Sequence, residues 1–426
     1  MKPRIFIQEF ASGGGLLDDS LDPKLLVEGF GMLRVLLSNF QRLGYNPITT
    51  LDKRLSFLTS FLPTKGIIQV ATAQEFIEKG LEAVKQCDYF LIIAPGSAGI
   101  LSSLVQNYQQ TQALSLNSSP QAISFTSNKL KMYKLCSQYQ VSYPQTYAIY
   151  PNGSYEEIAV PKQGLVERNW PELLQQKRLN YPLILKPNDG VACEGLTLCS
   201  TLEQLKKNIR EFFEQNPARI LLLQEFIPGD NLSVSAIIHE KKCEILSINK
   251  QLVSLKSDRS EYLGGISNIS HPLATKINHV CKMIVSKLPG VNGFIGLDFI
   301  ATKKPRDKNK IYLLELNPRV TTPFCGLLAP QNQPITPFFA GGNKRKKPLP
   351  REQSTRNPCY FSKIMVRRSS KWTTKKYPQL LTNPGIITPP LDFEKNTGSI
   401  AFIRGLGKTA EQAKQAFDKN CRELVK

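Results

Sequence analysis

The sequence predicts an α/β protein that begins with a parallel sheet, continues into a larger α+β part and ends in a small, basic α+β segment. Three observations support this order. Strand and helix signals alternate at the start of the chain, which is the pattern of a parallel sheet layered with helices. Strand-like runs joined by polar loops then dominate up to residue 320, and basic residues gather beyond residue 340.

The N-terminal elements are the clearest. Residues 4–10 predict a strand, residues 26–44 an amphipathic helix that ends at Gly44, and residues 87–96 a second, buried strand. Glycine-rich turns at Gly13–Gly15 and Gly96–Gly99 lie where a parallel sheet places its ligands. Because neither turn carries the full dinucleotide-binding fingerprint, we interpret both as tight turns.

Two lysines in the middle of the chain lie where a polyphosphate could bind. Residues 126–128 are candidate N-caps for a helix with Lys129 in its first turn, where the helix dipole disfavours a cation unless an anion such as phosphate is bound. Lys186 ends an apolar strand and precedes a loop, residues 188–195, with two glycines. Each lysine alone could equally be a surface lysine whose stem packs on apolar residues.

Two strand-like runs near residue 300 place polar side chains on one face. Residues 293–300 and 311–317 predict strands, and the polar, proline-containing segment between them indicates a hairpin loop. Side chains two residues apart on a strand share a face, so Glu315 and Asn317 point the same way. An edge strand with one face in water would also explain this pair.

The pairing of these strands decides whether a second carboxylate joins Glu315. With Ala301 opposite Lys310, Asp298 falls opposite Leu313 and on the face of Glu315. Two carboxylates about 4 Å apart repel by roughly 4 kcal/mol at an effective dielectric near 20, unless a cation lies between them. Oxygen ligands of this kind suit Mg²⁺ held together with nucleotide phosphates. The sequence therefore predicts a site for metal-bound ATP.

Composition limits the class of protein. The 426 residues, of which 41% are hydrophobic, are enough for two or three domains with real cores. We find neither a secretory signal nor a run of eighteen apolar residues, so we expect a cytoplasmic protein without a membrane span. Nine cysteines with no CxxC pair, and only three histidines, argue against a disulfide framework and against a zinc site.

Positive charge is concentrated toward the C-terminus. Residues 331–426 hold 19 Lys and Arg against 6 Asp and Glu, and the whole chain carries a net charge of +21. We interpret residues 336–358 as a basic, solvated linker. Binding of a polyanion, an anionic membrane surface or small anions is also compatible with this charge. Residues 398–417 predict a strand, a glycine turn and a closing helix.

Taken in order, the motifs of residues 1–330 resemble those of the ATP-grasp ligases. Six stretches carry the resemblance: "SNKLKMY", "LILKP", "NDGVACEG", "LLLQEFIPGDNLSVS", "GLDFI" and "ELNPR". Further stretches resemble the branch that contains tyramine-glutamate ligase and related predicted carboligases, namely "EFASGGGL", "IIAPGSAGIL", "INKQLV", "YLGGIS" and "LNPRVTTPFCGL". The chain departs from the family at Asn128, where Asp is common, and at Ala192 and Cys193, which we expect to stiffen the glycine loop.

The resemblance implies a role for each motif residue. Phosphate and loop contacts of the nucleotide would come from Lys129, Lys186, Asp189, Gly190 and Gly195. The adenine side would be formed by Glu225, Phe226 and Ile227. The ligands of Mg²⁺, or of Mn²⁺, would be Asp298, Glu315 and Asn317. Lys186 and Arg319 would be catalytic, with Arg319 steadying the transferred phosphoryl group or an acyl phosphate.

The same resemblance implies a domain order. Residues 1–115 would form a pre-ATP-grasp α/β domain and residues 116–335 the ATP-grasp domain that binds nucleotide and Mg²⁺. Residues 336–358 would be the basic linker, and residues 359–426 a small C-terminal subdomain.

The implied reaction is an ATP-dependent ligation of a carboxylate to an amine. It would pass through an acyl phosphate and release ADP and phosphate, with glutamate and an amine such as tyramine as candidate substrates. A different amino acid or peptide as substrate stays open, as does a non-catalytic protein that binds nucleotides or polyanions. We expect small-molecule partners, no membrane and no nucleic acid, and leave a homo-oligomer open.

Overall fold

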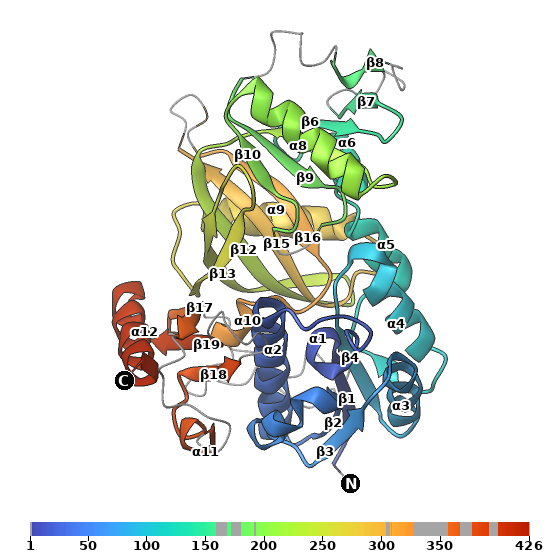
Figure 1. The fold of residues 1–426 in the computed structure, drawn as a ribbon, viewed down its shortest axis with the longest axis vertical. Coiled ribbons are helices and arrows are strands. Elements are labelled where there is room, and N and C mark those ends of the chain that lie inside the picture. Colours follow the sequence, from blue (N-terminus) through green and yellow to red (C-terminus); the bar gives the residue numbers. More distant parts are fainter. Residues whose placement is uncertain are drawn as a thin grey trace.

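The structure is a computed structural model that describes residues 2–158, 168–171, 180–190, 193–303, 307, 309–327, 357–366, 377–391 and 399–425. Three sheets organise these residues (Figure 1). The N-terminal sheet lies at the bottom of Figure 1 and the two antiparallel sheets lie above it, while the C-terminal strands lie beside the first long helix. The predicted α/β class, with a parallel sheet before an α+β part, is confirmed.

The N-terminal sheet is parallel and five-stranded, in the order β3-β2-β1-β4-β5. Its strands are β1 (Arg4–Glu9), β2 (Asn46–Asp52), β3 (Gly66–Val70), β4 (Tyr89–Ile93) and β5 (Leu114–Ser115). Between them lie the helices α1 (Phe10–Gly13), α2 (Pro23–Arg42), α3 (Ala73–Lys85) and α4 (Ile100–Tyr108) and the 3-10 turns η1 (Lys53–Phe61) and η2 (Ser97–Gly99). Ile5 and Ile7 pack toward α2, whereas Phe6 packs toward α3 and α4, so helices cover both faces.

Local sequence signals explain where helix α2 begins and ends. The side chain of Asp22 accepts a hydrogen bond from the Lys24 backbone N–H, and Pro23 occupies the first turn, where its missing N–H costs nothing. The helix ends at Arg42, and Gly44 follows with a φ of +88°, a conformation that glycine adopts readily. The predicted end of this helix at Gly44 is confirmed.

The second sheet is antiparallel, and helix α8 packs on it. Its strand order is β10-β9-β11-β6-β7-β8. The strands are β6 (Thr146–Ile149), β7 (Ser154–Glu157), β8 (Arg168–Asn169), β9 (Leu183–Pro187), β10 (Thr197–Cys199) and β11 (Leu221–Glu225). Helices α5 (Pro120–Thr126) and α6 (Lys129–Gln138) precede it, and α8 (Leu202–Gln215) buries Leu205 and Ile209 against it.

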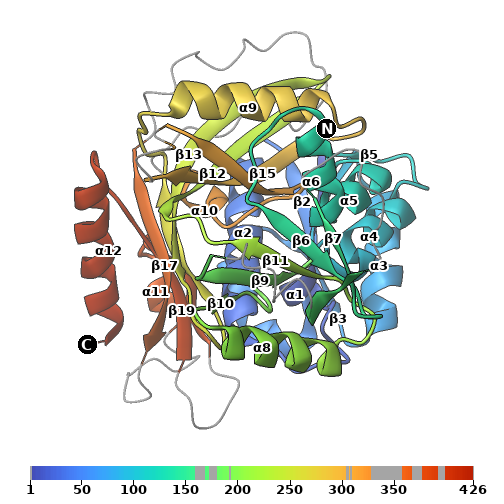
Figure 2. The ribbon, with the colours of Figure 1, turned by 90° about the horizontal axis from the view of Figure 1, so that it is seen from above.

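The third sheet has eight strands in the order β16-β15-β12-β13-β14-β17-β19-β18. They are β12 (Gly229–His239), β13 (Lys242–Ser254), β14 (Glu261–Ser267), β15 (Gly293–Thr302), β16 (Ile311–Asn317), β17 (Cys359–Val366), β18 (Ile386–Leu391) and β19 (Ser399–Leu406). The accompanying helices are α9 (Ala274–Ser286), α10 (Phe324–Leu327), α11 (Tyr377–Leu380) and α12 (Ala410–Val425). Figure 2 shows α9 and α12 on the outside of this sheet.

The C-terminal strands continue this sheet instead of forming one of their own. β17 pairs with β14, and β19 pairs with both β17 and β18. The predicted strand, turn and helix near the C-terminus correspond to β19 and α12. The domain boundaries at residues 115, 335 and 358 stay predictions, because residues 336–356 of the predicted linker lie outside the described residues.

The pairing of β15 with β16 differs from the register that we assumed. Ala301 lies opposite Ile311, not Lys310, and a bulge at Leu314 brings Asp298 opposite Glu315 instead of Leu313. The assumed register was wrong by one position at Ala301, and the extra residue of the bulge adds one more before Asp298. The predicted convergence of the two carboxylates holds nevertheless, because Asp298 now lies directly opposite Glu315. β16 is also the edge strand of its sheet.

The described helices include none that is both long enough and apolar enough to cross a lipid bilayer.

Helix α2 also holds the C-terminal strands in place. The Arg34 guanidinium donates hydrogen bonds to the carbonyls of Ile386, at 2.7 Å, and Ile387, at 2.8 Å. Thr388 donates from its hydroxyl to the Val27 carbonyl at 2.7 Å. These bonds join the N-terminal helix to β18, which lies more than 340 residues later in the chain.

We expect Arg34→Met to lower the free energy of unfolding by about 3 kcal/mol, because two buried carbonyls lose a charged donor. Urea unfolding followed by circular dichroism measures the change. Lys85→Met, at an exposed position near the end of α3, is the matched control and should shift stability by less than about 0.5 kcal/mol. Equal stability of the two variants would show that Arg34 does not hold β18.

Candidate active site

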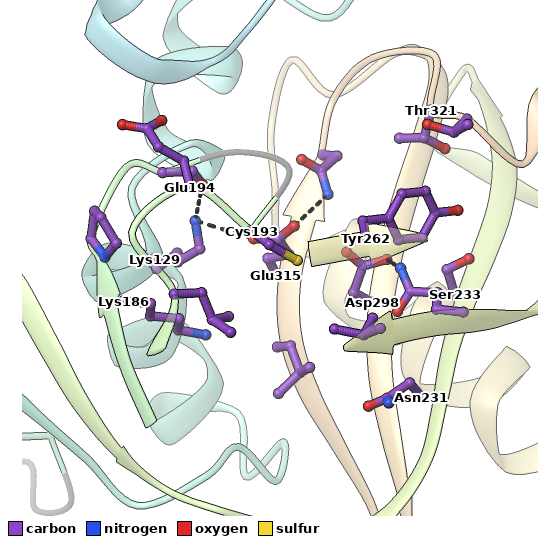
Figure 3. Close-up of a pocket in the computed structure, with 18 of the residues that line it drawn as sticks. Lys129, Lys186, Cys193, Glu194, Asn231, Ser233, Tyr262, Asp298, Glu315 and Thr321 are labelled. Atoms are coloured by element: carbon purple, nitrogen blue, oxygen red, sulfur yellow. Dashed lines mark hydrogen bonds and ion pairs between the residues drawn. The ribbon is translucent and has the colours of Figure 1, made fainter. Parts of the chain in front are cut away.

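A cavity with a volume of about 330 Å³ is lined by residues of all three sheets. One side comes from β9 and the loop that follows it, and the other from β12, β13, β15 and β16. Helix α2 and the segment after β4 contribute the wall on the side of the N-terminal domain. Figure 3 shows Lys129, Lys186 and Glu194 on one side of this space, Asp298 on the other and Glu315 between them.

The centre of the site is the carboxyl pair of Asp298 and Glu315. Burial and the charge of Glu315 raise the pKa of Asp298 well above its ordinary value. Burial would also raise the pKa of Glu315, but the Lys129 ammonium and the hydrogen bonds from Asp298 and Asn317 lower it to about 2. Of the two carboxyl groups, Asp298 is therefore the one that binds a proton more readily.

Lys129 holds Glu315 from the opposite side of the cavity. Its Nζ lies 3.1 Å from Glu315 Oε2 and donates a 2.6 Å hydrogen bond to the Gly190 carbonyl (Figure 3). Asn128 caps α6 by accepting from the Lys131 backbone N–H, which makes Lys129 the first residue of the helix. The anion that compensates this cation is thus a side chain of the protein itself, so a bound phosphate is not required to explain its position.

Lys186 is buried at the end of β9 and is held by an aromatic residue. Its Nζ donates to the Tyr133 hydroxyl at 2.8 Å and lies 5.4 Å from the centre of the same ring. Tyr133 in turn donates to the Leu314 carbonyl at 2.6 Å. Burial lowers the pKa of Lys186 to about 8, against the attraction of Glu315 and Asp298. This lysine therefore loses its charge at a mildly alkaline pH.

Arg319 brings a buried guanidinium to the same cavity. Among the described residues, it donates one hydrogen bond, to the Val320 carbonyl at 3.1 Å. Burial lowers its pKa, while four carboxylates act in the opposite direction: Glu315, Asp298, Glu28 and Glu9. Most of its N–H donors are thus available to an anionic ligand.

The glycine loop after β9 is anchored through Arg219. The guanidinium of this residue donates to Asp189 at 3.0 Å and 3.1 Å and to Glu194 at 2.9 Å. Gly195 adopts a φ of +63° and would place a Cβ 2.8 Å from Pro187. Asp189 and Gly195 therefore shape the loop, and neither lines the main cavity.

The structure brings most of the predicted site residues together. The main cavity is lined by Lys129, Lys186, Gly190, Glu225, Phe226, Ile227, Asp298, Glu315, Asn317 and Arg319. Glu225 ends β11, Phe226 and Ile227 follow it directly, and all three border the cavity. Their individual roles stay proposals.

Sequence reasoning missed Gln251 on β13, Tyr262 on β14, and Glu28 on α2. All three line the cavity. Gln251 donates to Asp298 Oδ1 at 3.0 Å, and it lies inside the stretch "INKQLV" that the resemblance had marked without a role. Tyr262 likewise opens the stretch "YLGGIS", which the resemblance had marked without a role, whereas no quoted motif includes Glu28.

Comparison with known proteins identifies the class. Residues 126–323 match the model of the ATP-grasp domain, and residues 45–123 match that of the pre ATP-grasp 3 domain. The chain therefore contains a pre-ATP-grasp domain followed by an ATP-grasp domain, and its similarity to named ligases indicates a C–N bond-forming ligase.

Within this class the chain is similar to a tyramine–L-glutamate ligase of Methanocaldococcus jannaschii, with 29% identity over 328 residues that cover 76% of this chain and 84% of the relative. An ATP-grasp superfamily protein from Archaeoglobus fulgidus shares the fold, with a TM-score of 0.58, 20% identity and coverage of 94% and 99% of the two chains. So does the N5-carboxyaminoimidazole synthase of Aspergillus clavatus in complex with ADP, with a TM-score of 0.64, 13% identity and coverage of 100% and 98%.

The donor set fits a small divalent cation. Among the described residues, no three His, Cys, Asp or Glu side chains form a metal cluster. A cation would thus be held by Asp298, Glu315 and the amide oxygen of Asn317, whose Nδ2 donates to Glu315 Oε1 at 3.0 Å. Two neighbouring carboxylates repel each other unless a cation lies between them, and Mg²⁺ completes its shell with phosphates and water.

We expect Asp298→Asn and Glu315→Gln to lower ADP formation by about two orders of magnitude or more, because each removes a ligand of the cation. Both variants should also lose most of the gain in ATP affinity that Mg²⁺ gives over EDTA, measured by titration calorimetry. Glu211→Gln, on the exposed face of α8, is the control. Normal activity and a normal Mg²⁺ effect in both variants would remove the metal assignment.

The pKa of Lys186 predicts a pH dependence. The ammonium form binds phosphate, and it is present below pH 8 and lost as the pH rises through about 8. Affinity for ATP should therefore fall between pH 7.5 and pH 9.5. Arg keeps its charge throughout this range, so the fall should disappear in Lys186→Arg. The same fall in both proteins would assign it to another group.

Proposed function

We propose that this protein activates a carboxylate with ATP as an acyl phosphate and then transfers the acyl group to an amine, with ADP and phosphate as products. The observation that carries the proposal is the meeting of Lys129, Lys186 and Arg319 with the carboxyl pair of Asp298 and Glu315 in one cavity. Phosphoryl transfer needs positioning and charge neutralisation more than covalent chemistry, and this set supplies both.

In the first step, an oxygen of the substrate carboxylate attacks the γ-phosphorus of ATP. The bond from the γ-phosphorus to the bridging oxygen breaks, and ADP leaves with that electron pair. Lys186 and Lys129 lie where they would bind the phosphates, and Arg319 where it would hold the transferred group and the acid. Bound Mg²⁺, held by Asp298, Glu315 and Asn317, would supply further neutralisation of phosphate charge.

In the second step, the amine nitrogen attacks the acyl carbon. The bond from this carbon to the phosphate oxygen breaks, inorganic phosphate leaves and the nitrogen loses a proton to give the amide. Water must be kept away, because it would attack the same carbon. Gly190, Cys193 and Glu194 of the glycine loop border the cavity and form one part of its cover.

The candidate substrates are inferred from the similar tyramine–L-glutamate ligase. Glutamate as the acid and tyramine or a similar amine as the acceptor are the first candidates, since a tyramine–L-glutamate ligase matches most of this chain. Small-molecule substrates of this kind and a cytoplasmic location belong to the same proposal.

Hydroxylamine tests the proposal without knowledge of the natural amine. With ATP, Mg²⁺, glutamate and hydroxylamine, we expect the protein to form ADP and the hydroxamate of glutamate in equal amounts, because hydroxylamine intercepts an acyl phosphate. Product analysis by ion-exchange chromatography separates ADP from AMP. AMP and pyrophosphate would overturn the mechanism, whereas hydroxamate from another acid would change only the proposed acid.

A further inference from the structure

The oxygen atoms of the carboxyl pair already accept contacts from donors of the protein itself. Glu315 Oε2 lies 3.1 Å from Lys129 Nζ (Figure 3), and Glu315 Oε1 accepts a hydrogen bond from Asn317 Nδ2 at 3.0 Å. On the neighbouring strand, Gln251 Nε2 donates to Asp298 Oδ1 at 3.0 Å. One ammonium and two amide groups therefore contact the oxygens to which a metal ion would bind.

Lys129 is the donor that cannot share an oxygen with a metal ion. A carboxylate oxygen has two lone-pair sites, so it can accept an amide hydrogen bond and bind a metal ion at the same time. An ammonium carries a full positive charge, and two cations on one oxygen repel each other where little water screens them. The Lys129 side chain is 8% exposed and that of Glu315 is 24% exposed. Lys129 and a metal ion therefore compete for Glu315.

The backbone of Lys129 is fixed, whereas its side chain can change partner. The Lys129 backbone N–H donates to the Asn188 carbonyl at 3.1 Å, and the next N–H, of Leu130, donates to the Asn188 side chain at 2.8 Å. These bonds hold the first turn of α6 against the loop after β9. The ammonium group sits on a flexible stem of four carbon atoms, so Nζ can move to another anion without a shift of the backbone.

A bound nucleotide would give this ammonium group a second anion. Lys186 and Arg319 line the same cavity as Lys129, so phosphates that bind to them also lie within the cavity. A diphosphate or triphosphate carries more negative charge than one carboxylate, and it attracts an ammonium group more strongly. Once Lys129 moves to the phosphates, its place at Glu315 is open to a metal ion that the same phosphates also bind.

We propose that Lys129 occupies the cation position at Glu315 as long as no nucleotide is bound, and that a nucleotide opens this position by drawing the ammonium group to its phosphates. A metal ion then binds weakly to the protein alone and tightly to its nucleotide complex. By linkage, the nucleotide gains the same factor in affinity from the metal ion. The inference rests on the proposed nucleotide and metal sites and adds a coupling between them, in which Lys129 is the competing cation.

Binding of Mn²⁺ to the nucleotide-free protein tests the competition. Mn²⁺ replaces Mg²⁺ as the probe because electron paramagnetic resonance measures its free concentration. We expect Lys129→Gln, which keeps a hydrogen-bond donor and removes the charge, to bind Mn²⁺ at least about tenfold more tightly than the unchanged protein does. Circular dichroism checks the fold of the variant. An unchanged affinity for Mn²⁺ would overturn the inference.

Further variants isolate the effect of the charge and the place where Mn²⁺ binds. Lys129→Met removes the charge with a different side chain and should show the same gain, whereas Lys129→Arg keeps a cation beside Glu315 and should bind Mn²⁺ as weakly as the unchanged protein. Asp298→Asn, added to Lys129→Gln, should remove the gain. Lys131→Gln, at an exposed position of the same helix, is the matched control and should leave the affinity unchanged. An equal gain in Lys131→Gln would assign the effect to net charge and overturn the role of Lys129.

The coupling is measured with ADP, which binds without turnover. Titration calorimetry gives the affinity for ADP in EDTA and in saturating Mn²⁺, and the formation of the Mn²⁺–ADP complex in solution is common to both proteins. We expect the gain in ADP affinity from Mn²⁺ to be about tenfold smaller in Lys129→Gln than in the unchanged protein, because the variant has no ammonium group to displace. An equal gain in the two proteins would contradict the coupling.

Failure of this inference and failure of the proposed function are distinguishable, because the binding measurements use neither an acid nor an amine. If Lys129→Gln gains affinity for Mn²⁺ but no acid yields ADP and hydroxamate, the competition stands and the ligase reaction is wrong. If hydroxamate forms but Lys129→Gln gains no affinity, the ligase reaction stands and only the competition is wrong.

Discussion

The ion pair between Lys129 and Glu315 is the interaction on which the rest of the site depends. It joins the first residue of α6 to the edge strand β16, and the bond from Lys129 to the Gly190 carbonyl adds the loop after β9. Three segments that are far apart in the sequence therefore meet at one ammonium group. Lys129 stabilises the charge of Glu315, and this charge raises the pKa of the neighbouring Asp298. A cation between the two carboxylates would relieve their repulsion.

A second set of contacts completes the cavity from the C-terminal strands. Hydrogen bonds from Arg34 and Thr388 join α2 to β18. Lys363 of β17 forms an ion pair with Glu28 of the same helix. The nucleotide side of the cavity thus depends on β9, β11, β15 and β16, whereas the wall at α2 is held by β17 and β18, at the other end of the eight-stranded sheet.

Sequence reasoning found the parts of the site that strand periodicity and local motifs specify. Lys186 ends an apolar strand, and Asp298 and Glu315 lie on strands with a clear hairpin between them, so their convergence could be predicted. The register could not, because nothing in the sequence marks the bulge at Leu314. Tertiary partners were equally hidden: Asp189 binds Arg219, thirty residues away, and the cavity positions of Glu28 and Tyr262 follow only from how α2 and β14 pack together.

The strand order also has a consequence for how the protein is made. The edge of β14 is covered by β17, and β17 in turn by β19, which ends at Leu406. A chain that emerges from the ribosome with its N-terminus first can bring its nucleotide ligands together long before this edge is covered. Until then β14 presents unpaired backbone groups, which favour association with other chains. The strands after residue 357 therefore both hold Glu28 in the cavity wall and cover an aggregation-prone edge.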